Sequence, residues 1–335
     1  MNMIECIFTI DYEIYGNGTG SLKELIYEPA RRLGKLFRKW NVRFVIFVEA
    51  AELRSIEAAG TDRDIALIER QISELHREGF EIALHLHPQW SNSRHEGGQW
   101  RLDFTEYNLC TLPQRRVEEI VDQSLGYLRH AVGESDFNPI SFRAGNWLFQ
   151  PAKTAAAVLG QRGIRIDSSV FKGGLQHIHG LDYRRAPRNG YYWRFEEDAI
   201  EPDTRGSWME VPIYTEMVPT WSVFTGKRVV QGNGFSGALQ TRWQKFNRLR
   251  DFVRLSYPLK LDLCRMKLSE LTSMMGRIMR EDSATPDQYR PIVSIGHTKD
   301  PIDYDTVDEF LSFLRAAGIS IVTFLDAYPK LLNNA

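Results

Sequence analysis

The amino-acid sequence predicts an α/β fold, either a βα barrel or an open α/β sheet, with one insertion. Short runs rich in β-branched and aromatic residues alternate with longer segments of helical periodicity, which is typical of βα units. Gly79, Gly163 and Gly318 each follow a helical segment directly before a strand, where glycine commonly ends a helix. The 335 residues, 43% of them hydrophobic, suffice for one barrel of roughly 250 residues plus an insertion.

The expected strands and helices alternate along the chain. The strands are apolar runs at residues 4–10, 42–48, 80–85, 140–143, 164–166, 209–213, 292–295 and 319–323. The helices cover residues 24–40, 62–78, 113–132, 151–161 and 303–317. Pro113 and Pro151 suit the first turn of their helices, because proline lacks a backbone N–H that the first turn leaves unused. Each of these helices separates two strands, as the crossovers of a parallel sheet require.

Residues from about 172 to 290 interrupt this order. We expect one barrel domain over residues 1–335, with a partly helical basic insertion at about 172–290 whose long helical stretch covers residues 237–280. Residues 226–290 hold 13 Lys and Arg against 6 Asp and Glu. This basic segment is either the solvated face of a packing helix or a dock for an anionic carrier, such as a nucleotide- or lipid-linked sugar. The second interpretation also predicts peripheral contact with a membrane.

Net charge and cysteine usage exclude several classes of protein. A formal charge of -1 gives no global field that would attract nucleic acid, so we expect no nucleic-acid partner. Cys6, Cys110 and Cys264 have neither metal-ligand spacing nor the pattern of a disulfide framework, which favours a reducing compartment. The sequence contains no run of about 18 apolar residues and no signal-peptide pattern. We therefore expect no transmembrane segment and a cytoplasmic location.

Carboxylates follow the first expected strand. The active site of a βα barrel lies at the carboxyl ends of its strands, so polar residues just beyond each strand are candidates for it. The first strand runs into the sequence TIDYE, and its period of two puts Asp11 and Glu13 on one face. Two such carboxylates repel each other unless a cation or a metal is present. The pair is therefore a candidate base and metal ligand, and a solvated strand end is the alternative.

Two histidines lie at the end of the third expected strand. The sequence IALHLH places His85 and His87 on one face by the same alternation. Two histidines with one carboxylate and an open position are typical of a catalytic Zn²⁺ site. The sequence therefore predicts a divalent metal bound by His85, His87 and a carboxylate from the first strand.

Polar residues also lie at the ends of the fourth, fifth and seventh strands. Arg143 is suited to pair with a carboxylate and hold it ionised, as a general base requires. Asp167 is a candidate for orienting Arg143 or His297, and His297 is a candidate general acid. Taken alone, each of these residues is also typical of a structural role, as a surface ion pair, a turn residue or a loop residue.

In this order, the strand-end motifs resemble those of the polysaccharide deacetylase family, also called the NodB-homology or carbohydrate esterase family four group. The resemblance spans residues 4 to about 170 and resumes from about 205 to 327. FTIDYE resembles the first motif, EIALHLHPQW the second, FRAGNW the third, the segment from Asp167 the fourth and SIGHT the fifth. The resemblance implies a distorted (β/α)7 barrel of the glycoside hydrolase and deacetylase type. It also implies a divalent metal and the removal of N- or O-acetyl groups from sugars.

The first motif departs from the family pattern. In the family, the base Asp is directly followed by a metal-binding Asp, whereas Asp11 is followed here by Tyr12 and then by Glu13. The resemblance therefore implies that Asp11 is the base. It leaves two alternatives for the metal-binding carboxylate, which is either Glu13 or Asp11 itself.

The second and third motifs depart as well. The family places its second histidine four positions after the first, where this chain has Gln89. His85 is therefore assigned as a ligand by the motif, and His87 by its chemistry alone. In the third motif Arg143 is kept, but residues 145–147 (GNW) replace the usual Pro-Tyr, which leaves the oxyanion donor open.

Together these observations predict a metal-dependent hydrolase that removes an N- or O-acyl group, such as acetyl, from a carbohydrate. The expected catalytic residues are Asp11, Arg143, Asp167 and His297, and the expected metal ligands are Glu13, His85 and His87, with Asp11 as an alternative. Zn²⁺ is the expected metal, with Co, Ni or Mn as alternatives. An intracellular precursor of a surface polysaccharide is the expected substrate. The alternatives are an inactive barrel that binds a glycan or a protein partner, and another amidohydrolase or glycosidase on the same fold.

Overall fold

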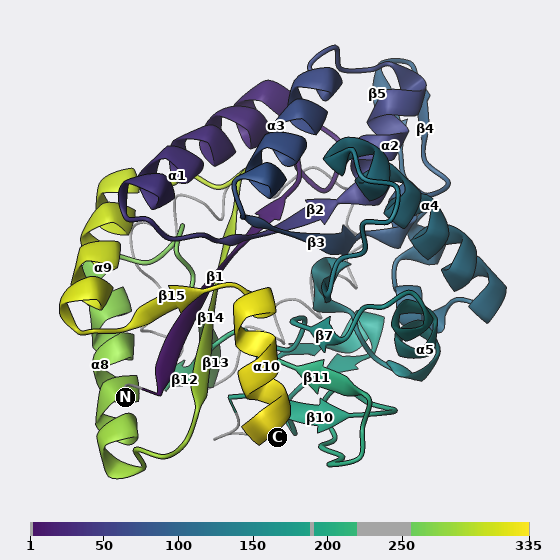
Figure 1. Cartoon of the computed structure of the whole chain (residues 1–335). Helices are drawn as coiled ribbons and strands as arrows, with labels where there is room; N and C mark the ends of the chain where they lie inside the picture. Colours follow the sequence, from purple (N-terminus) through teal and green to yellow (C-terminus); the bar gives the residue numbers. More distant parts are fainter. Residues whose placement is uncertain (1–2, 188–190, 220–255, 335) are drawn as a thin grey trace.

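Parallel strands around a common core form the frame of the molecule (Figure 1). The computed structural model describes residues 3–187, 191–219 and 256–334. Neighbouring strands of the main sheet are, in order, β10 (Trp193–Phe195), β11 (Trp208–Glu210), β7 (Ile166–Asp167), β6 (Ser141–Ala144), β3 (Glu81–Leu86), β2 (Val45–Glu49), β1 (Ile4–Tyr12) and β14 (Arg290–His297), and β15 (Ser320–Val322) also pairs with β1. Among the described residues, every pairing in this sheet is parallel except that of β10 with β11.

The two ends of the parallel sheet meet beyond β11. Ile213 forms parallel bridges to Phe171 and to Val293 of β14, and the backbone N–H of Tyr214 donates to the Val293 carbonyl at 2.9 Å. Within the described part of the chain, the seven strands from β11 to β14 thus run parallel around one core. This arrangement confirms the expected distorted (β/α)7 barrel.

Helices cover the outside of the sheet (Figure 1). They are α1 (Glu28–Lys39), which continues a π-helical turn at Lys23–Tyr27, α2 (Ala50–Ala59), α3 (Ile65–Arg77), α4 (Gln114–Val132), α5 (Lys153–Gln161), α8 (Leu268–Ala284), α9 (Tyr304–Ala316) and α10 (Phe324–Asn334). Phe8 of β1 contacts Phe37 of α1 and Phe310 of α9 edge to face, with ring centroids 5.4 and 6.0 Å apart. All nine residues of β1 are buried, as expected for a parallel strand that is covered on both faces. None of the described helices is long and apolar enough to cross a membrane.

Three small antiparallel sheets lie outside the main one. They are β4 (Arg94–Glu96) with β5 (Gln99–Arg101), β8 (Leu175–Gln176) with β9 (Leu181–Asp182), and β12 (Thr215–Pro219) with β13 (Ser256–Lys260). Short 3₁₀ turns occur at Pro88–Trp90, Phe104–Glu106, Leu109–Thr111, Gly145–Trp147 and His177–His179. Within the expected insertion at 172–290, β10 and β11 belong to the main sheet, so this segment contributes directly to the barrel.

All eight expected strands are present, with ends that differ by a few residues. Gly79, Gly163 and Gly318 have φ values of 84°, 91° and 69°, so each ends its helix in the left-handed conformation as expected. Pro113 and Pro151 lie just before α4 and α5 rather than in their first turns. Two helices, α2 and α10, were not expected. The helix α2 precedes the one helix expected between β2 and β3, and α10 follows the last expected strand.

The expected helix at residues 237–280 is only partly correct. Residues 237–255 lie outside the described residues, and α8 begins at Leu268. Residues 256–260 form the strand β13 instead, in antiparallel register with β12, where Pro258 lies opposite Met217. Proline disfavours a helix because it has no N–H to donate and restricts the residue before it, here Tyr257, to extended conformations.

Candidate active site

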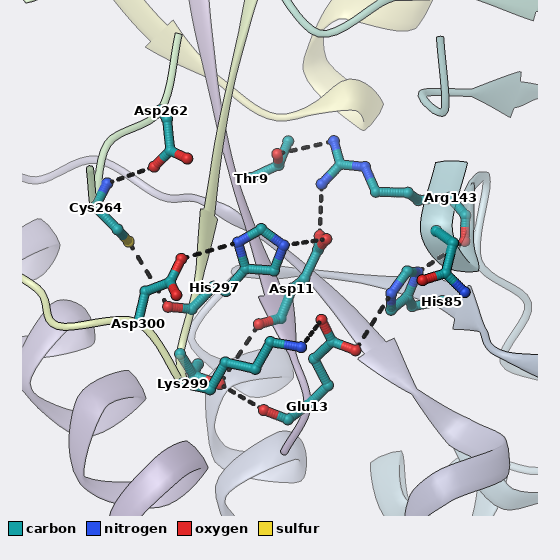
Figure 2. A network of polar contacts seen from close by, with 12 residues as sticks. Thr9, Asp11, Glu13, His85, Arg143, Asp262, Cys264, His297, Lys299 and Asp300 are labelled. Carbon is teal, nitrogen blue, oxygen red and sulfur yellow. Dashed lines mark hydrogen bonds and ion pairs between the residues drawn. The ribbon is translucent and has the colours of Figure 1, made fainter. Parts of the chain in front are cut away.

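The register of the parallel strands brings the predicted site residues together at the carboxyl ends of β1, β3, β6 and β14. Asp11 of β1 lies beside His297 of β14, and His85 of β3 lies beside Arg143 of β6. Parallel strands end at the same edge of a sheet, so polar residues that are distant in sequence become neighbours there. Figure 2 shows Asp11 between Arg143 and His297, and Glu13 between Lys299 and His85.

Asp11 is a buried carboxylate with a cation beside it. The Arg143 guanidinium donates through Nη1 to Asp11 Oδ1 at 2.6 Å, and His297 Nε2 lies 3.4 Å from Oδ2. Burial on its own would raise the pKa of Asp11, but Arg143, His85 and His297 outweigh it and lower this pKa. Asp11 is therefore ionised at neutral pH although its exposed fraction is only 2%.

Arg143 is held in a single orientation by the core of the barrel. It is fully buried, and it donates to the Ser168 carbonyl and to Thr9 Oγ1, both at 2.9 Å. Its guanidinium also stacks 4.1 Å above the ring of Phe47. Since Arg143 has no freedom to turn away, the orientation of Asp11 is fixed as well.

Glu13, His85 and His87 form a second cluster next to Asp11. One oxygen of Glu13, Oε2, lies 3.2 Å from His87 Nε2 and 3.8 Å from His85 Nε2. All three residues are buried, and their candidate ligand atoms lie within 4.8 Å of one another. A carboxylate oxygen and two imidazole nitrogens facing one point are donors that a divalent metal such as Zn²⁺ prefers.

Hydrogen bonding fixes the tautomer of His85. The Nδ1–H of His85 donates to the carbonyl of Arg143 at 2.8 Å, because a carbonyl can only accept. The lone pair of Nε2 then points to the cluster, which is the arrangement of a metal-ligating histidine. Burial lowers the pKa of His85 to about 4, so the imidazole is neutral and can act as a ligand at physiological pH.

His87 is held by its backbone and by its packing against Gly145. Its N–H donates to Glu49 Oε2 at 2.6 Å. A Cβ on Gly145 would come within 2.7 Å of His87 Cγ and within 2.5 Å of the Leu86 carbonyl oxygen, so only glycine fits there.

The ring of His87 has two amide side chains beside Nδ1. Gln89 Nε2 lies 3.2 Å and Asn146 Nδ2 3.3 Å from this nitrogen, and the buried Oε1 of Gln89 has no partner among the described residues. A half-turn of the Gln89 amide would let Oε1 accept Nδ1–H, which frees Nε2 for a metal. The donor set therefore fits a divalent metal ion.

Lys299 balances the charge of Glu13 in the structure. Its Nζ donates to Glu13 Oε1 at 2.8 Å, on the opposite oxygen from the two histidines. Burial would raise the pKa of Glu13, but Lys299 and the neighbouring histidines lower it well below its usual value. The oxygen of Glu13 that faces the two histidines, Oε2, is thus free of Lys299.

His297 lies between two carboxylates. Its Nδ1 is 3.3 Å from Asp300 Oδ2, and its Nε2 faces Asp11. Burial would lower the pKa of His297, but Asp300 and Asp11 outweigh it and raise this pKa. The imidazole can therefore carry a proton near neutral pH, as a general acid must.

Asp167 does not orient Arg143 or His297, and this expectation is wrong. Its carboxylate accepts the Ser169 hydroxyl at 2.6 Å and the Ser169 N–H at 3.2 Å, and it also bonds to the side chain of Glu210. Ser168 holds Arg143, and Asp300 lies beside His297. Asp167 does lie at a strand end, as the last residue of β7, but its side chain points to Glu210 of the next strand, β11, instead of the site.

Sequence reasoning missed several residues of this region. Glu49 ends β2 directly beside His85, and Lys299 and Asp300 follow His297 in the same loop. The rule that singled out the other strand ends would also have found Glu49, because β2 is followed by the same kind of polar position.

Comparison with known proteins shows the fold. No protein-family model matches the chain, and no curated protein matches its sequence. A solved structure described as a polysaccharide deacetylase from Mycobacterium smegmatis is 15% identical, with a TM-score of 0.54 over 99% of this chain and 91% of that one. Puue allantoinase is 14% identical, with a TM-score of 0.52 over 97% of this chain and 89% of that one. A GH57 branching enzyme from the archaeon Thermococcus kodakaraensis is 12% identical, with a TM-score of 0.54 over 97% and 71%.

The chain therefore has the polysaccharide deacetylase fold and is a divergent example of it. The resemblance of the motifs is confirmed at the level of the fold. Because the same barrel carries different chemistries, the function has to be argued from the site residues.

Proposed function

We propose that this protein is a metal-dependent hydrolase that removes an N- or O-acyl group, such as acetyl, from a carbohydrate. The observation that carries the proposal is the buried cluster of Glu13, His85 and His87 beside the ionised Asp11. A structural metal site would not need a separate buried carboxylate and a protonated imidazole next to it. Hydrolysis needs both, one to accept a proton and one to donate it.

Glu13, His85 and His87 would hold the metal through Oε2 and the two Nε2 atoms. When bound, a divalent metal would polarise the acyl carbonyl and favour ionisation of water. We propose Zn²⁺, with Co, Ni or Mn as alternatives, because nitrogen and oxygen donors suit all of these ions.

Asp11 and His297 would move the protons. Asp11, held ionised by Arg143, is the proposed base that accepts a proton from the attacking water. His297, whose pKa the adjacent carboxylates raise, is the proposed acid that donates a proton to the leaving amine or alkoxide. The two groups lie 3.4 Å apart, so one small reacting centre can be within reach of both.

The proposed substrate is a nucleotide- or lipid-linked sugar that serves as a precursor of a surface polysaccharide. The proposed location is the cytoplasm, and the proposal includes peripheral membrane contact through the basic segment at 172–290, part of which lies outside the described residues. The three cysteines support a reducing compartment, because all of them are buried and free. The basic composition of residues 226–290 supports a phosphate-bearing carrier.

A second candidate function is an inactive barrel that binds a glycan or a protein partner. The ion pair of Lys299 with Glu13 favours it, because an ammonium group already neutralises the carboxylate that a metal would need. Metal content separates the two candidates.

The experiment is elemental analysis of the protein purified without chelator, before and after reconstitution with Zn²⁺. The test variant is His85→Ala/His87→Ala, and the matched control is His95→Ala/His130→Ala, which removes two exposed histidines. We expect about one metal ion per chain in the wild type and the control, and none in the test variant.

Acetylated sugars and sugar nucleotides are then assayed with the same preparations. Release of acetate that disappears in the Asp11→Asn variant, in which metal is retained, supports the proposed base. Absence of metal from the reconstituted wild type, or equal metal content in the test variant, would exclude the proposed hydrolase and favour the binding protein.

A further inference from the structure

Lys260, the last residue of β13, lies between two aromatic rings. Its Nζ is 3.5 Å from the ring centroid of Trp147 and 4.4 Å from that of Phe171. The side chain is half-buried, and no residue in the described part of the chain accepts a hydrogen bond from Nζ or forms an ion pair with it. Ring faces stabilise a cation but accept its N–H bonds only weakly, so the three donors of the ammonium group remain available.

The carboxylates whose charges act on Lys260 are bound to other groups. Asp262 Oδ1 accepts the backbone N–H groups of Cys264 and Arg265, each at 3.0 Å. Asp11 pairs with Arg143 at 2.6 Å. Burial lowers the pKa of Lys260 to about 7, and Asp262 only partly offsets this effect. Within residues 3–187, 191–219 and 256–334, the amine therefore lacks a counter-ion. A charged group in such a position is costly unless it is paired.

Lys260 lies beside the candidate active site. The charges of both Asp11 and Arg143 act on its amine. The chain continues from β13 to Asp262, which forms a bridge to Ile295 of β14 two residues before His297. Figure 2 shows Asp262 next to Cys264, close to His297.

Trp147 is fixed in a conformation that is unfavourable for a large residue. Its φ is 60°, in the left-handed region, and Tyr183 holds it there by donating its hydroxyl to the Trp147 carbonyl at 2.6 Å. The preceding Asn146 contacts His87, so the strained turn links the candidate metal ligands to the ring that covers Lys260. Strain of this kind is retained where the surrounding structure enforces a functional geometry.

We propose that Lys260 and Trp147 form a recognition site for an anionic group of the substrate, a carboxylate or a phosphate, next to the reacting acyl group. This inference rests on the proposed function, since it names the substrate class of the same site. A neutral sugar hydroxyl could accept one N–H but would leave the charge unpaired. An anion supplies both the acceptor and the counter-charge, and it favours the protonated form of the amine.

The test compares three sugars that share the N-acetylglucosamine unit. N-acetylglucosamine is neutral, its 1-phosphate carries a phosphate, and N-acetylmuramic acid carries a carboxylate. Affinity for wild type, Lys260→Met and Lys260→Gln is measured by calorimetry. We expect one anionic sugar to bind wild type about tenfold or more tightly than the neutral sugar, and this preference to fall to near unity in both variants. The preferred sugar identifies the anion as a phosphate or a carboxylate.

The matched control is Lys153→Met, which removes an exposed lysine that is paired with Glu197 on the surface. This variant should keep the full preference of wild type for the anionic sugar. Lys260→Gln retains N–H donors without the charge, so it provides a second variant if Lys260→Met does not fold.

Equal affinity of wild type for all three sugars, or an anion preference that both Lys260 variants keep, would overturn the inference. The measured quantity is affinity and not product release, so this result is separate from the metal analysis. A wild type that prefers the anion through Lys260 but holds no metal would overturn the proposed hydrolase alone.

Discussion

Asp11 and Glu13 show how two carboxylates can lie side by side in a buried position. Each has its own cation, Arg143 for Asp11 and Lys299 for Glu13, and the pKa of each is lowered despite burial. The cations approach from different directions, so the carboxylates face different partners. One oxygen of Glu13 faces two histidines, while Asp11 faces one. This difference supports Glu13 as the metal ligand and Asp11 as the base.

Asn146, next to His87, has a left-handed backbone conformation. Its φ and ψ are 55° and 18°, in the left-handed region that costs most L-residues roughly 1 kcal/mol. We expect Asn146→Ala to be less stable than Asn146→Gly by about 1 kcal/mol, because both lose the amide and only glycine tolerates this conformation freely. Chemical denaturation of the two variants measures this difference.

The comparison has an internal control in Gly126, which lies within the helix α4 with open space around its Cβ position. At this position alanine should be more stable than glycine, the reverse of the order at residue 146, since alanine favours a helix. Equal stability of the two Asn146 variants would show that the turn relaxes when the amide is lost.

On the scale of elements, the start of α2 places two buried carboxyl groups, those of Glu49 and Glu52, beside the candidate metal ligands. Glu49 caps this helix by accepting the N–H of Glu52 at 3.3 Å, and it also accepts the His87 N–H. Glu52 accepts the N–H of Ile14 at 2.8 Å, just after Glu13. These bonds connect β1, β3 and α2, so the start of the helix sets where the candidate ligands lie.

Glu52 makes the stability of the protein depend on pH. Burial, and secondarily the charge of Glu13, raises the pKa of Glu52 to about 8. Between its unfolded pKa of about 4.3 and this value, the carboxyl is ionised in the unfolded state and protonated in the folded state. The free energy of unfolding therefore decreases as pH rises through this range. Above the folded pKa it no longer depends on this group.

We expect Glu52→Gln to gain stability relative to wild type as pH rises from 5 to 8, by on the order of 3 kcal/mol, because glutamine keeps the acceptor and has no proton to bind. Chemical denaturation at both pH values measures the change. Glu57→Gln, at an exposed position of the same helix, is the control and should change little. A pH-independent difference for Glu52→Gln would show that its carboxyl is ionised in the folded protein.

Much of this element-level structure could be predicted from the sequence. Alternating apolar runs located the strands, and the ends of these strands located Asp11, His85, Arg143 and His297. The direction of a side chain beyond the strand could not be predicted, since it depends on the neighbouring strand, and Asp167 turned to Glu210 for this reason. Lys260 lies in a strand that pairs outside the main sheet, so no strand-end rule applied to it.

Considered as a whole molecule, the barrel assembles its site from segments far apart in sequence. Asp11 and His297 are neighbours across β1 and β14, and Ile213 closes the barrel against β14. No short fragment contains the site, so a metal bound there would stabilise only the closed barrel. Binding to the folded state alone raises stability by about 2.7 kcal/mol at a hundredfold excess over Kd.

The Lys299–Glu13 ion pair predicts how removing Lys299 would change the stabilisation by a bound metal. Without metal, Lys299 is the cation that neutralises Glu13, and a bound metal would take over part of this role. Lys299→Met should therefore lower the Tm of the metal-free protein, because Glu13 is left buried without its cation. The same variant should show a larger rise in Tm on adding Zn²⁺ than wild type, whereas His85→Ala should show no rise. Thermal unfolding with and without Zn²⁺ measures all three proteins. If Lys299→Met gained no more than wild type, the ammonium group and the metal would not share the charge of Glu13.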